Sequence, residues 1–347
     1  MRRKRLFRLL LPLCSFNYKD YCINILDTPG HQDFSEDTYR TLMAADSAVM
    51  VIDASKGVEA QTIKLFKVCV MRHIPIFTFI NKMDLEARDS FELLDEIENV
   101  LGIRTCPINW PIGAGKRFKG VYDRDTKKVS MFQAVSVGGA KSAAETDYDV
   151  TDPALKDAVG DELYAQLMDE IELLDGASDE FDQELVDKGE LSPVFFGSAL
   201  TTFGVQTFLE HFLKMTQSPL PRMSDAGLID PITEPFSGFV FKIQANMNKA
   251  HHDRIAFMRI SSGKFDATKE VYHVQSGRKL RLSQPQQIMH RIVRLLMRRM
   301  PVMSSVYSIR VFSLSEIRYV RRERNSSTRE SRPLHRNISA DWFTWIR

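Results

Sequence analysis

Three short polar segments of the sequence carry groups that could bind a nucleotide. The Asp84 carboxylate can accept two hydrogen bonds from the ring N–H and the exocyclic amine of guanine, an arrangement that adenine does not offer. The stem of Lys82 can lie along the base, and Asn81 can tie neighbouring loops together. The three segments are Asp27-Thr28-Pro29-Gly30-His31, Asn81-Lys82-Met83-Asp84 and Gly197-Ser198-Ala199-Leu200.

The other two segments offer groups for the rest of such a ligand. The backbone N–H groups of Ser198 and Ala199 can donate to the guanine carbonyl oxygen. Asp27 can reach a Mg²⁺ ion through water, and the Gly30 N–H can meet a γ-phosphate. Together the segments predict a site for a guanine nucleotide.

Each segment follows a short apolar run. The runs are residues 21–26, 75–80 and 193–196, and a further run covers residues 47–53. Short, mainly apolar runs that stop at polar loops are typical of buried parallel strands. Open α/β sheets bind ligands at the carboxyl ends of their strands, so we expect the three loops to converge on one crevice.

Helical patterns separate these runs, at residues 35–45, 59–73, 90–101 and 204–215. We expect Ser90 to cap the third helix and Gly102 to end it. This alternation predicts an α/β fold with a doubly wound sheet of the P-loop GTPase type. Residues 140–190 predict an acidic helical insertion with a solvated face.

The pattern changes after the proline-rich residues 217–235, which we interpret as a linker. Period-two runs at residues 239–244, 254–260, 270–275 and 278–283 predict the first strands of an antiparallel barrel or sandwich. We therefore divide the chain into a basic N-terminal segment, a partial nucleotide-binding domain, a partial β-barrel domain and an Arg-rich tail. Their predicted bounds are 1–17, 18–225, 232–287 and 288–347.

Composition excludes several classes of protein. With 44% hydrophobic and 27% charged residues, the chain is neither disordered nor collagen-like, and no apolar run reaches the ~18 residues of a membrane span. Four scattered cysteines favour a reducing compartment over a disulfide scaffold or a zinc site. The net charge of +2 conceals +5 on residues 1–17, +9 on residues 288–347 and −12 between them.

The segments DTPGH, NKMD and GSAL resemble the third, fourth and fifth sequence elements of the GTP-binding domain in translational GTPases. The resemblance implies GTP or GDP with Mg²⁺ as ligands, and a GTPase in which His31 is catalytic because it orients the attacking water. Asp27 would hold Mg²⁺ through water.

Longer runs closely resemble the peptide chain release factor 3 family over about residues 18–287. They are DYCINILDTPGHQDFSEDTYRTLMAADSAVMVIDASKGVEAQT, FKVCVMRHIPIFTFINKMD, CPINWPIG and DRIAFMRISSG. This resemblance implies a cytoplasmic, monomeric translation termination factor that recycles class-I release factors on the ribosome and has no membrane partner. The alternatives are a non-catalytic remnant, or another translational GTPase such as an elongation factor G relative. Residues 104–112 and 254–263 favour release factor 3 over the latter.

The phosphate cradle GxxxxGK[ST] is missing from the residues before Asp27, which contain no glycine. Gly113-Ala114-Gly115-Lys116-Arg117 only imitates it, because Trp110 stands where the first glycine belongs and Arg117 replaces Ser or Thr. The switch threonine is missing too. In this fold the strand that feeds the cradle lies between the 21–26 strand and the 47–53 strand, so we expect the middle of the sheet to be open, with two buried strand edges unpaired. We also expect ~mM nucleotide affinity or weaker, and impaired hydrolysis.

The two ends differ in character from the rest of the chain. Residues 1–17 fit a signal peptide, a membrane-surface helix, or sequence that is not native to the family. Residues 288–347 contain 13 arginines, no lysine and no periodicity, which fits either an RNA-binding segment or a stretch read in the wrong frame. We expect both ends to be frame-shifted flanks.

Overall fold

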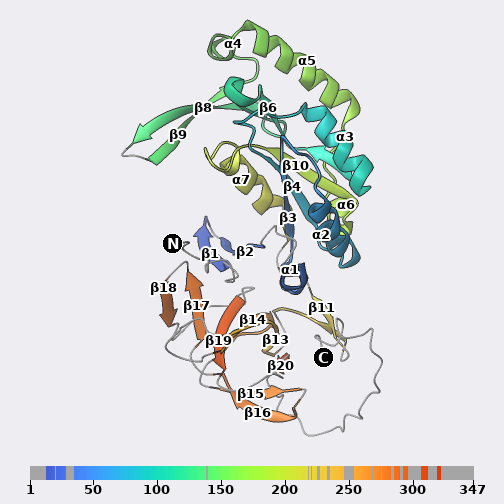
Figure 1. Ribbon diagram of the computed structural model, residues 1–347, viewed down its shortest axis with the longest axis vertical. Helices are drawn as coiled ribbons and strands as arrows, with labels where there is room; N and C mark the ends of the chain where they lie inside the picture. The colour runs from blue at the N-terminus through green and yellow to red at the C-terminus, as the bar shows by residue number, and fades with distance from the viewer. Residues whose placement is uncertain are drawn as a thin grey trace, which may run out of the picture. The chain divides into compact units, whose positions relative to one another are not determined.

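The computed structural model of the chain describes residues 13–19, 21–28, 35–137, 140–217, 219, 221–224, 227–232, 235–245, 254–266, 269–274, 276–282, 285–289, 292–295, 306–311 and 319–321. They divide into two compact units (Figure 1). Residues 46–217 form the α/β unit. The described residues up to Ala45 and after Gln217 form the β-rich unit.

The α/β unit contains a parallel sheet, an antiparallel sheet and surrounding helices. Its elements in chain order are β3 (Ala48–Asp53), α2 (Ala60–Met71), β4 (Ile76–Asn81), α3 (Ser90–Leu101), β5 (Arg104–Pro107), β6 (Asn109–Ile112), the 3₁₀ turn η2 (Gly115–Arg117), β7 (Gly120–Asp123), β8 (Lys128–Val137), β9 (Ala140–Asp149), α4 (Pro153–Val159), α5 (Asp161–Ala177), α6 (Gln183–Lys188), β10 (Leu191–Phe196) and α7 (Val205–Met215).

The parallel sheet has the strand order β3-β4-β10-β5, and all its neighbouring pairs are parallel. The predicted strands at 47–53, 75–80 and 193–196 are confirmed as its first three. On one face, the rings of Phe77 and Phe79 pack against Phe212 and Phe208 of α7, with centroids 4.8 and 5.4 Å apart. Helices α2 and α3 lie on the other side (Figure 1). This is the doubly wound arrangement that the alternation predicted.

Strand β3 has an open edge, because among the described residues it pairs only with β4. Val49 and Val51 are 42% and 57% exposed, although β4 and β10 are almost wholly buried. The register places these valines beside Phe77 and Phe79, on the face that α7 covers further along the sheet. Of the two unpaired edges that we expected, at residues 21–26 and 47–53, the one at 47–53 is present among the described residues.

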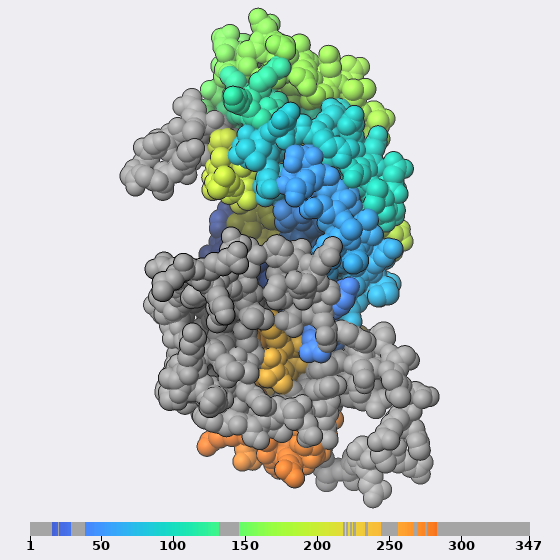
Figure 2. Space-filling view, viewed as in Figure 1, coloured from blue at the N-terminus to red at the C-terminus, as the bar shows by residue number. Residues whose placement is uncertain are grey.

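The antiparallel sheet, of order β6-β7-β8-β9, was not predicted from the sequence. The interpretation of residues 140–190 as wholly helical is wrong for the first ten, which form β9 and pair with β8 over their full length. The rest is helical as expected, and Figure 2 shows α4 and α5 in green at the surface of the unit.

Helix α3 shows how local chemistry sets its ends. The Asp89 side chain, rather than the predicted Ser90, caps it by accepting hydrogen bonds from the N–H groups of Phe91 and Glu92. Aspartate and serine are both favourable capping residues. Asp89 takes this role because it directly precedes Ser90, the first helical residue. Gly102 ends the helix as expected, with a left-handed φ of 71°.

The β-rich unit consists of two hairpins, one helix and a large sheet. Its elements are β1 (Leu13–Tyr18), β2 (Tyr21–Leu26), α1 (Ser35–Leu42), β11 (Arg222–Ser224), β12 (Gly227–Ile229), β13 (Ser237–Ala245), β14 (Arg254–Ser262), β15 (Glu270–His273), β16 (Arg278–Arg281), β17 (Pro285–Met289), β18 (Ile292–Leu295), β19 (Val306–Val311) and β20 (Tyr319–Arg321).

Strand β2 corrects one prediction. Residues 21–26 do not form a fully buried parallel strand; they pair antiparallel with β1, from Leu13↔Leu26 to Tyr18↔Tyr21. Tyr21 and Ile25 are about half exposed. The preceding residues supply the only backbone partner that β2 has among the described residues. Residues 13–17, expected to be atypical, thus belong to a regular hairpin.

The large sheet is antiparallel and has the order β16-β15-β20-β13-β14-β19-β17-β18. Its core includes Phe236, Val240, Met258, Ile260 and Val271. The four predicted strands after residue 238 are confirmed as β13 to β16. Three further strands, β18, β19 and β20, lie in the Arg-rich tail, where the sequence showed no periodicity, and their pairing with neighbouring strands defines them.

Two arginines bind the segment that follows α1. Arg222 donates to the carbonyl oxygens of Met43 and Ala45, at 2.9 and 3.4 Å, and Arg259 donates to that of Ala44 at 3.1 Å. Arg259 is only 4% exposed, and the Arg222 guanidinium lies over a phenylalanine ring. Cations suit the carbonyl end of a helix, so these contacts fix the end of α1 on the sheet.

Candidate functional site

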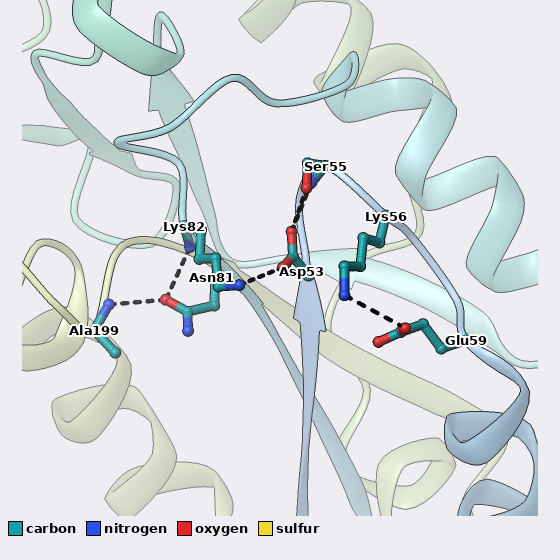
Figure 3. Close-up of polar contacts among 7 residues, drawn as sticks. All are labelled: Asp53, Ser55, Lys56, Glu59, Asn81, Lys82 and Ala199. Carbon is teal, nitrogen blue, oxygen red and sulfur yellow. Dashed lines mark hydrogen bonds and ion pairs between the residues drawn. The ribbon is translucent and has the colours of Figure 1, made fainter. Parts of the chain in front are cut away.

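The loops that leave β4 and β10 meet at the carboxyl edge of the parallel sheet. The Oδ1 atom of Asn81 accepts hydrogen bonds from the N–H of Lys82 at 2.8 Å and from the N–H of Ala199 at 2.9 Å (Figure 3). The Met83 N–H donates to the Gly197 carbonyl oxygen at 3.1 Å. The structure thus brings two of the three predicted segments together, and gives Asn81 the tying role expected of it.

Lys82 is held in an unusual conformation. Its φ is +73°, in the left-handed region, and its Nζ lies 2.5 Å from Oδ2 of Asp53 at the end of β3 (Figure 3). About half of its side-chain surface stays exposed, while its ammonium group is paired with Asp53.

Asp53 was not predicted as a site residue, although an aspartate at the end of an apolar run was the available signal. Burial opposes its ionisation, but hydrogen bonds from Lys82 and Ser55 outweigh that effect and hold its pKa at about 2, below the ordinary 3.8. The same hydrogen bond raises the pKa of Lys82. Both groups are therefore charged at neutral pH.

Asp84 has a carboxylate oxygen with no partner. Its Oδ1 atom is buried, yet no group in the described part of the chain donates a hydrogen bond to it. A buried acceptor without a donor costs about 1–3 kcal/mol. An external donor would remove that cost, and the two neighbouring N–H groups of guanine are donors of the expected kind. The residues present fit the base of a guanine nucleotide.

The 197–199 loop is tightly packed. A Cβ at Gly197 would lie 2.4 Å from the Phe203 carbonyl oxygen and 2.9 Å from the Phe79 ring, so only glycine fits. The Ser198 N–H, predicted to face the guanine carbonyl, instead donates to the Phe203 carbonyl oxygen at 2.9 Å. The Ala199 N–H is bonded to Asn81, as above. Both donors thus have acceptors within the chain.

The predicted phosphate end of the site is less complete. Asp27 and Thr28 follow β2 in the β-rich unit, and Asp27 is exposed. Pro29, Gly30 and His31 lie outside the described residues. No group of three or more potential metal-ligating side chains occurs among the residues that the structure describes. Mg²⁺ binding, the role of His31 and the convergence of all three loops stay predictions.

The GAGK segment forms no strand-to-helix cradle. Residues 113–119 connect two antiparallel strands, β6 and β7, through a short 3₁₀ turn. None of the described helices combines the length and the apolar character that a membrane span requires.

A parallel sheet between helical layers, with two tied loops at its carboxyl edge and an unpartnered carboxylate in one of them, defines a nucleotide-binding domain of the GTPase class. Residues 4–218 match the family model of the elongation factor Tu GTP binding domain, and residues 235–294 match that of elongation factor G domain 2. The chain belongs to the elongation factor Tu GTP-binding domain family.

Within that family, the chain is similar to proteins named peptide chain release factor 3, which confirms the resemblance. It is 58% identical over 289 residues to the one from Symbiobacterium thermophilum, covering 83% of this chain and 54% of that protein. It is 54% identical over 288 residues to the one from Synechococcus elongatus, covering 83% and 52%. The chain spans about half the length of these curated relatives.

A solved structure from Thermus thermophilus shares the fold, with a TM-score of 0.65 and 20% identity over 91% of this chain and 46% of that one. The matches to the two family models extend beyond residues 18–287 at both ends. They begin at residue 4 and end at residue 294, so they include most of the basic N-terminal segment and the start of the tail.

Proposed function

We propose that this chain binds the base of GTP or GDP at the edge formed by β4 and β10, as part of a translation termination GTPase. The observation that carries the proposal is the buried, unpartnered Oδ1 of Asp84. The two oxygens of a carboxylate can accept from both N–H groups on one edge of guanine. Adenine offers no such pair at that edge.

The neighbouring groups complete the recognition of the base. The half-exposed stem of Lys82 lies along the base while Asp53 holds its charge. The Ala199 N–H reaches the guanine carbonyl oxygen by exchanging its present acceptor, Asn81. One hydrogen bond is replaced by another, so this exchange costs little.

The proposed activity of the whole protein rests on its resemblance to the peptide chain release factor 3 family. In this proposal the whole protein hydrolyses GTP and recycles class-I release factors from the ribosome, in the cytoplasm and as a monomer. His31 orients the attacking water, and Asp27 meets Mg²⁺ through water. Bound Mg²⁺ would offset phosphate charge.

The open edge of β3 favours a second candidate, a remnant that binds guanine nucleotides weakly and without hydrolysis. The exposed Val49 and Val51 mark a place where the sheet lacks a neighbouring strand among the described residues. Without a phosphate cradle, the base contacts alone give an affinity of about 1 mM or weaker.

Ligand-observed NMR with GDP, ADP and XDP tests the base assignment at millimolar ligand. The parent chain should bind GDP in preference to ADP. Asp84→Asn should weaken GDP and shift the preference toward XDP, because the xanthine ring offers an acceptor where guanine has its amine. Asp95→Asn, at an exposed aspartate of α3, is the matched control. Equal binding of GDP and ADP, or no change in preference in Asp84→Asn, would contradict the assignment.

A further inference from the structure

The segment that imitates a phosphate cradle contacts the Asn81–Asp84 loop. The Gly115 N–H donates to the Met83 carbonyl oxygen at 2.8 Å. Gly115 has a φ of +60°, and an added Cβ would meet only ordinary van der Waals contacts, the nearest at 3.4 Å. Its glycine is therefore required by backbone conformation rather than by space. Met83 directly precedes Asp84, so this bond acts on the base-recognising residue.

The first residue of β6 contacts the other loop. The Asn109 Oδ1 accepts from the Phe196 N–H at 2.7 Å, and its Nδ2 donates to the Phe196 carbonyl oxygen at 3.1 Å. Asn109 is fully buried. Its amide thus pairs with Phe196 as a neighbouring strand would, just before Gly197. Asn109 fixes the point at which the 197–199 loop leaves the sheet.

Trp110 keeps this part of β6 in place. Its side chain is fully buried, and its Nε1 donates to Glu170 of α5 at 2.7 Å. Its ring packs against Phe196 and Phe91, with centroids 5.2 and 4.6 Å away. A strand anchored on α3, α5 and β10 is a rigid support.

We propose that Asn109 and Gly115 are positioning residues for base recognition, a role that rests on the proposed function. Asn109 sets the 197–199 loop, and Gly115 sets Asp84. The two loops are also bonded to each other, through Met83 and Gly197 and through Asn81 and Ala199. Strand β6 and the turn that follows it therefore contact both loops, so that little ordering is left for the ligand to impose.

The role of Gly115 is tested by measuring the binding of GDP and IDP to two variants. IDP lacks the exocyclic amine of guanine, so it loses one of the two bonds to Asp84. In Gly115→Val, a β-branched residue resists the positive φ. The ratio of the affinity for GDP to the affinity for IDP should therefore fall toward one. Gly115→Asn, which tolerates the left-handed conformation, should keep the parent preference. An unchanged preference in the valine variant overturns the role of Gly115.

The role of Asn109 is tested with Asn109→Ala, and Ser192→Ala is the control at an equally buried position. Asn109→Ala should weaken GDP and IDP alike, about 2- to 10-fold, because both carry the carbonyl oxygen that the Ala199 N–H meets. Ser192→Ala removes an equally buried polar group whose hydroxyl bonds Thr78 and Ile76 in mid-strand. It should leave both affinities unchanged, and an equal loss in this control overturns the role of Asn109.

Hydrogen exchange without nucleotide separates this inference from the proposed function. Asn109→Ala should speed exchange of the Ala199 amide, and Gly115→Val that of the Met83 amide, while Ser192→Ala changes neither. If the parent chain binds no guanine nucleotide, the proposed function fails, and base positioning fails with it even where faster exchange shows that the loops are supported. If GDP binds and exchange is unchanged, the positioning role alone is overturned.

Discussion

The Lys82 ammonium and the Asp53 carboxylate meet across the ends of two neighbouring strands, 2.5 Å apart between Nζ and Oδ2. The register of β3 and β4 places Asp53 directly beside Asn81. The pair thus joins the open-edged strand to the loop that carries Asp84, and it compensates for the left-handed backbone of Lys82.

This pair makes stability depend on pH in a defined window. Folding lowers the pKa of Asp53 from 3.8 to about 2, so the contribution of the pair to the free energy of unfolding is complete above about pH 4 and is lost as the pH falls through 2. In Asp53→Asn that contribution is absent. Urea unfolding from pH 6 to pH 2 should show the parent and the variant converging at low pH.

Lys82→Gln is the companion variant for this measurement. It removes the partner, so it should reduce the pH-dependent difference in the same window. A gap between parent and Asp53→Asn that stays constant from pH 6 to pH 2 would contradict the assignment.

Gly197→Ala should destabilise the α/β unit, by about 1–3 kcal/mol. The added methyl group would overlap the Phe203 carbonyl oxygen and the Phe79 ring, and the loop must move to admit it. Gly176→Ala in α5 is the control, since nothing lies within 4 Å of its added Cβ. That variant should be neutral or more stable by up to about 1 kcal/mol, because alanine favours a helix. Chemical denaturation compares the two, and equal effects would refute the packing argument.

The Asp123–His211 hydrogen bond links the antiparallel sheet to α7. The His211 Nε2 lies 2.7 Å from Asp123 Oδ2, and both residues are largely buried. Burial disfavours the charged carboxylate, yet hydrogen bonds from His211 and two backbone N–H groups hold the pKa of Asp123 below its ordinary value. His211→Leu should lower the free energy of unfolding by about 1–3 kcal/mol, because it leaves the carboxylate without this donor.

A double-mutant cycle checks that link. Asp123→Leu should cost more than His211→Leu, since it also removes the acceptor of the Asp125 and Thr126 N–H groups. The double variant should lose less than the sum of the two single losses. Additive losses would show that the two side chains do not interact.

Val51→Lys should leave the free energy of unfolding within about 0.5 kcal/mol of the parent and reduce aggregation. The side chain is largely exposed on an edge of β3 that pairs with no other described strand, and a charge there hinders pairing with another chain. Val194→Lys, at a fully buried position in β10, is the contrast and should prevent folding. Light scattering during storage gives the readout, and aggregation unchanged in Val51→Lys would rule out the open edge as its cause.

Much of the secondary structure of the α/β unit could be predicted from the sequence, because it depends on residues that are close together in the chain. Short apolar runs predicted three strands of the parallel sheet, and Gly102 predicted the end of α3, because strand burial and helix termination depend on neighbouring residues. The Asn81–Asp84 and Gly197–Ala199 loops were predicted to carry site residues for the same reason, and that prediction stays open. They directly follow those strands.

Tertiary pairing decided the rest. Residues 21–26 have the composition of a buried strand. Composition does not determine which strand pairs with them, and in the structure they pair antiparallel with β1. Strands β18 to β20 show no periodic pattern in the sequence. They are strands because their backbones form hydrogen bonds with neighbouring strands. The contacts of Lys82 with Asp53 and of Asn109 with Phe196 join residues 29 and 87 positions apart. The sequence alone determined which side chains could recognise a guanine base; only folding determined which groups hold them in place and which donors are already engaged.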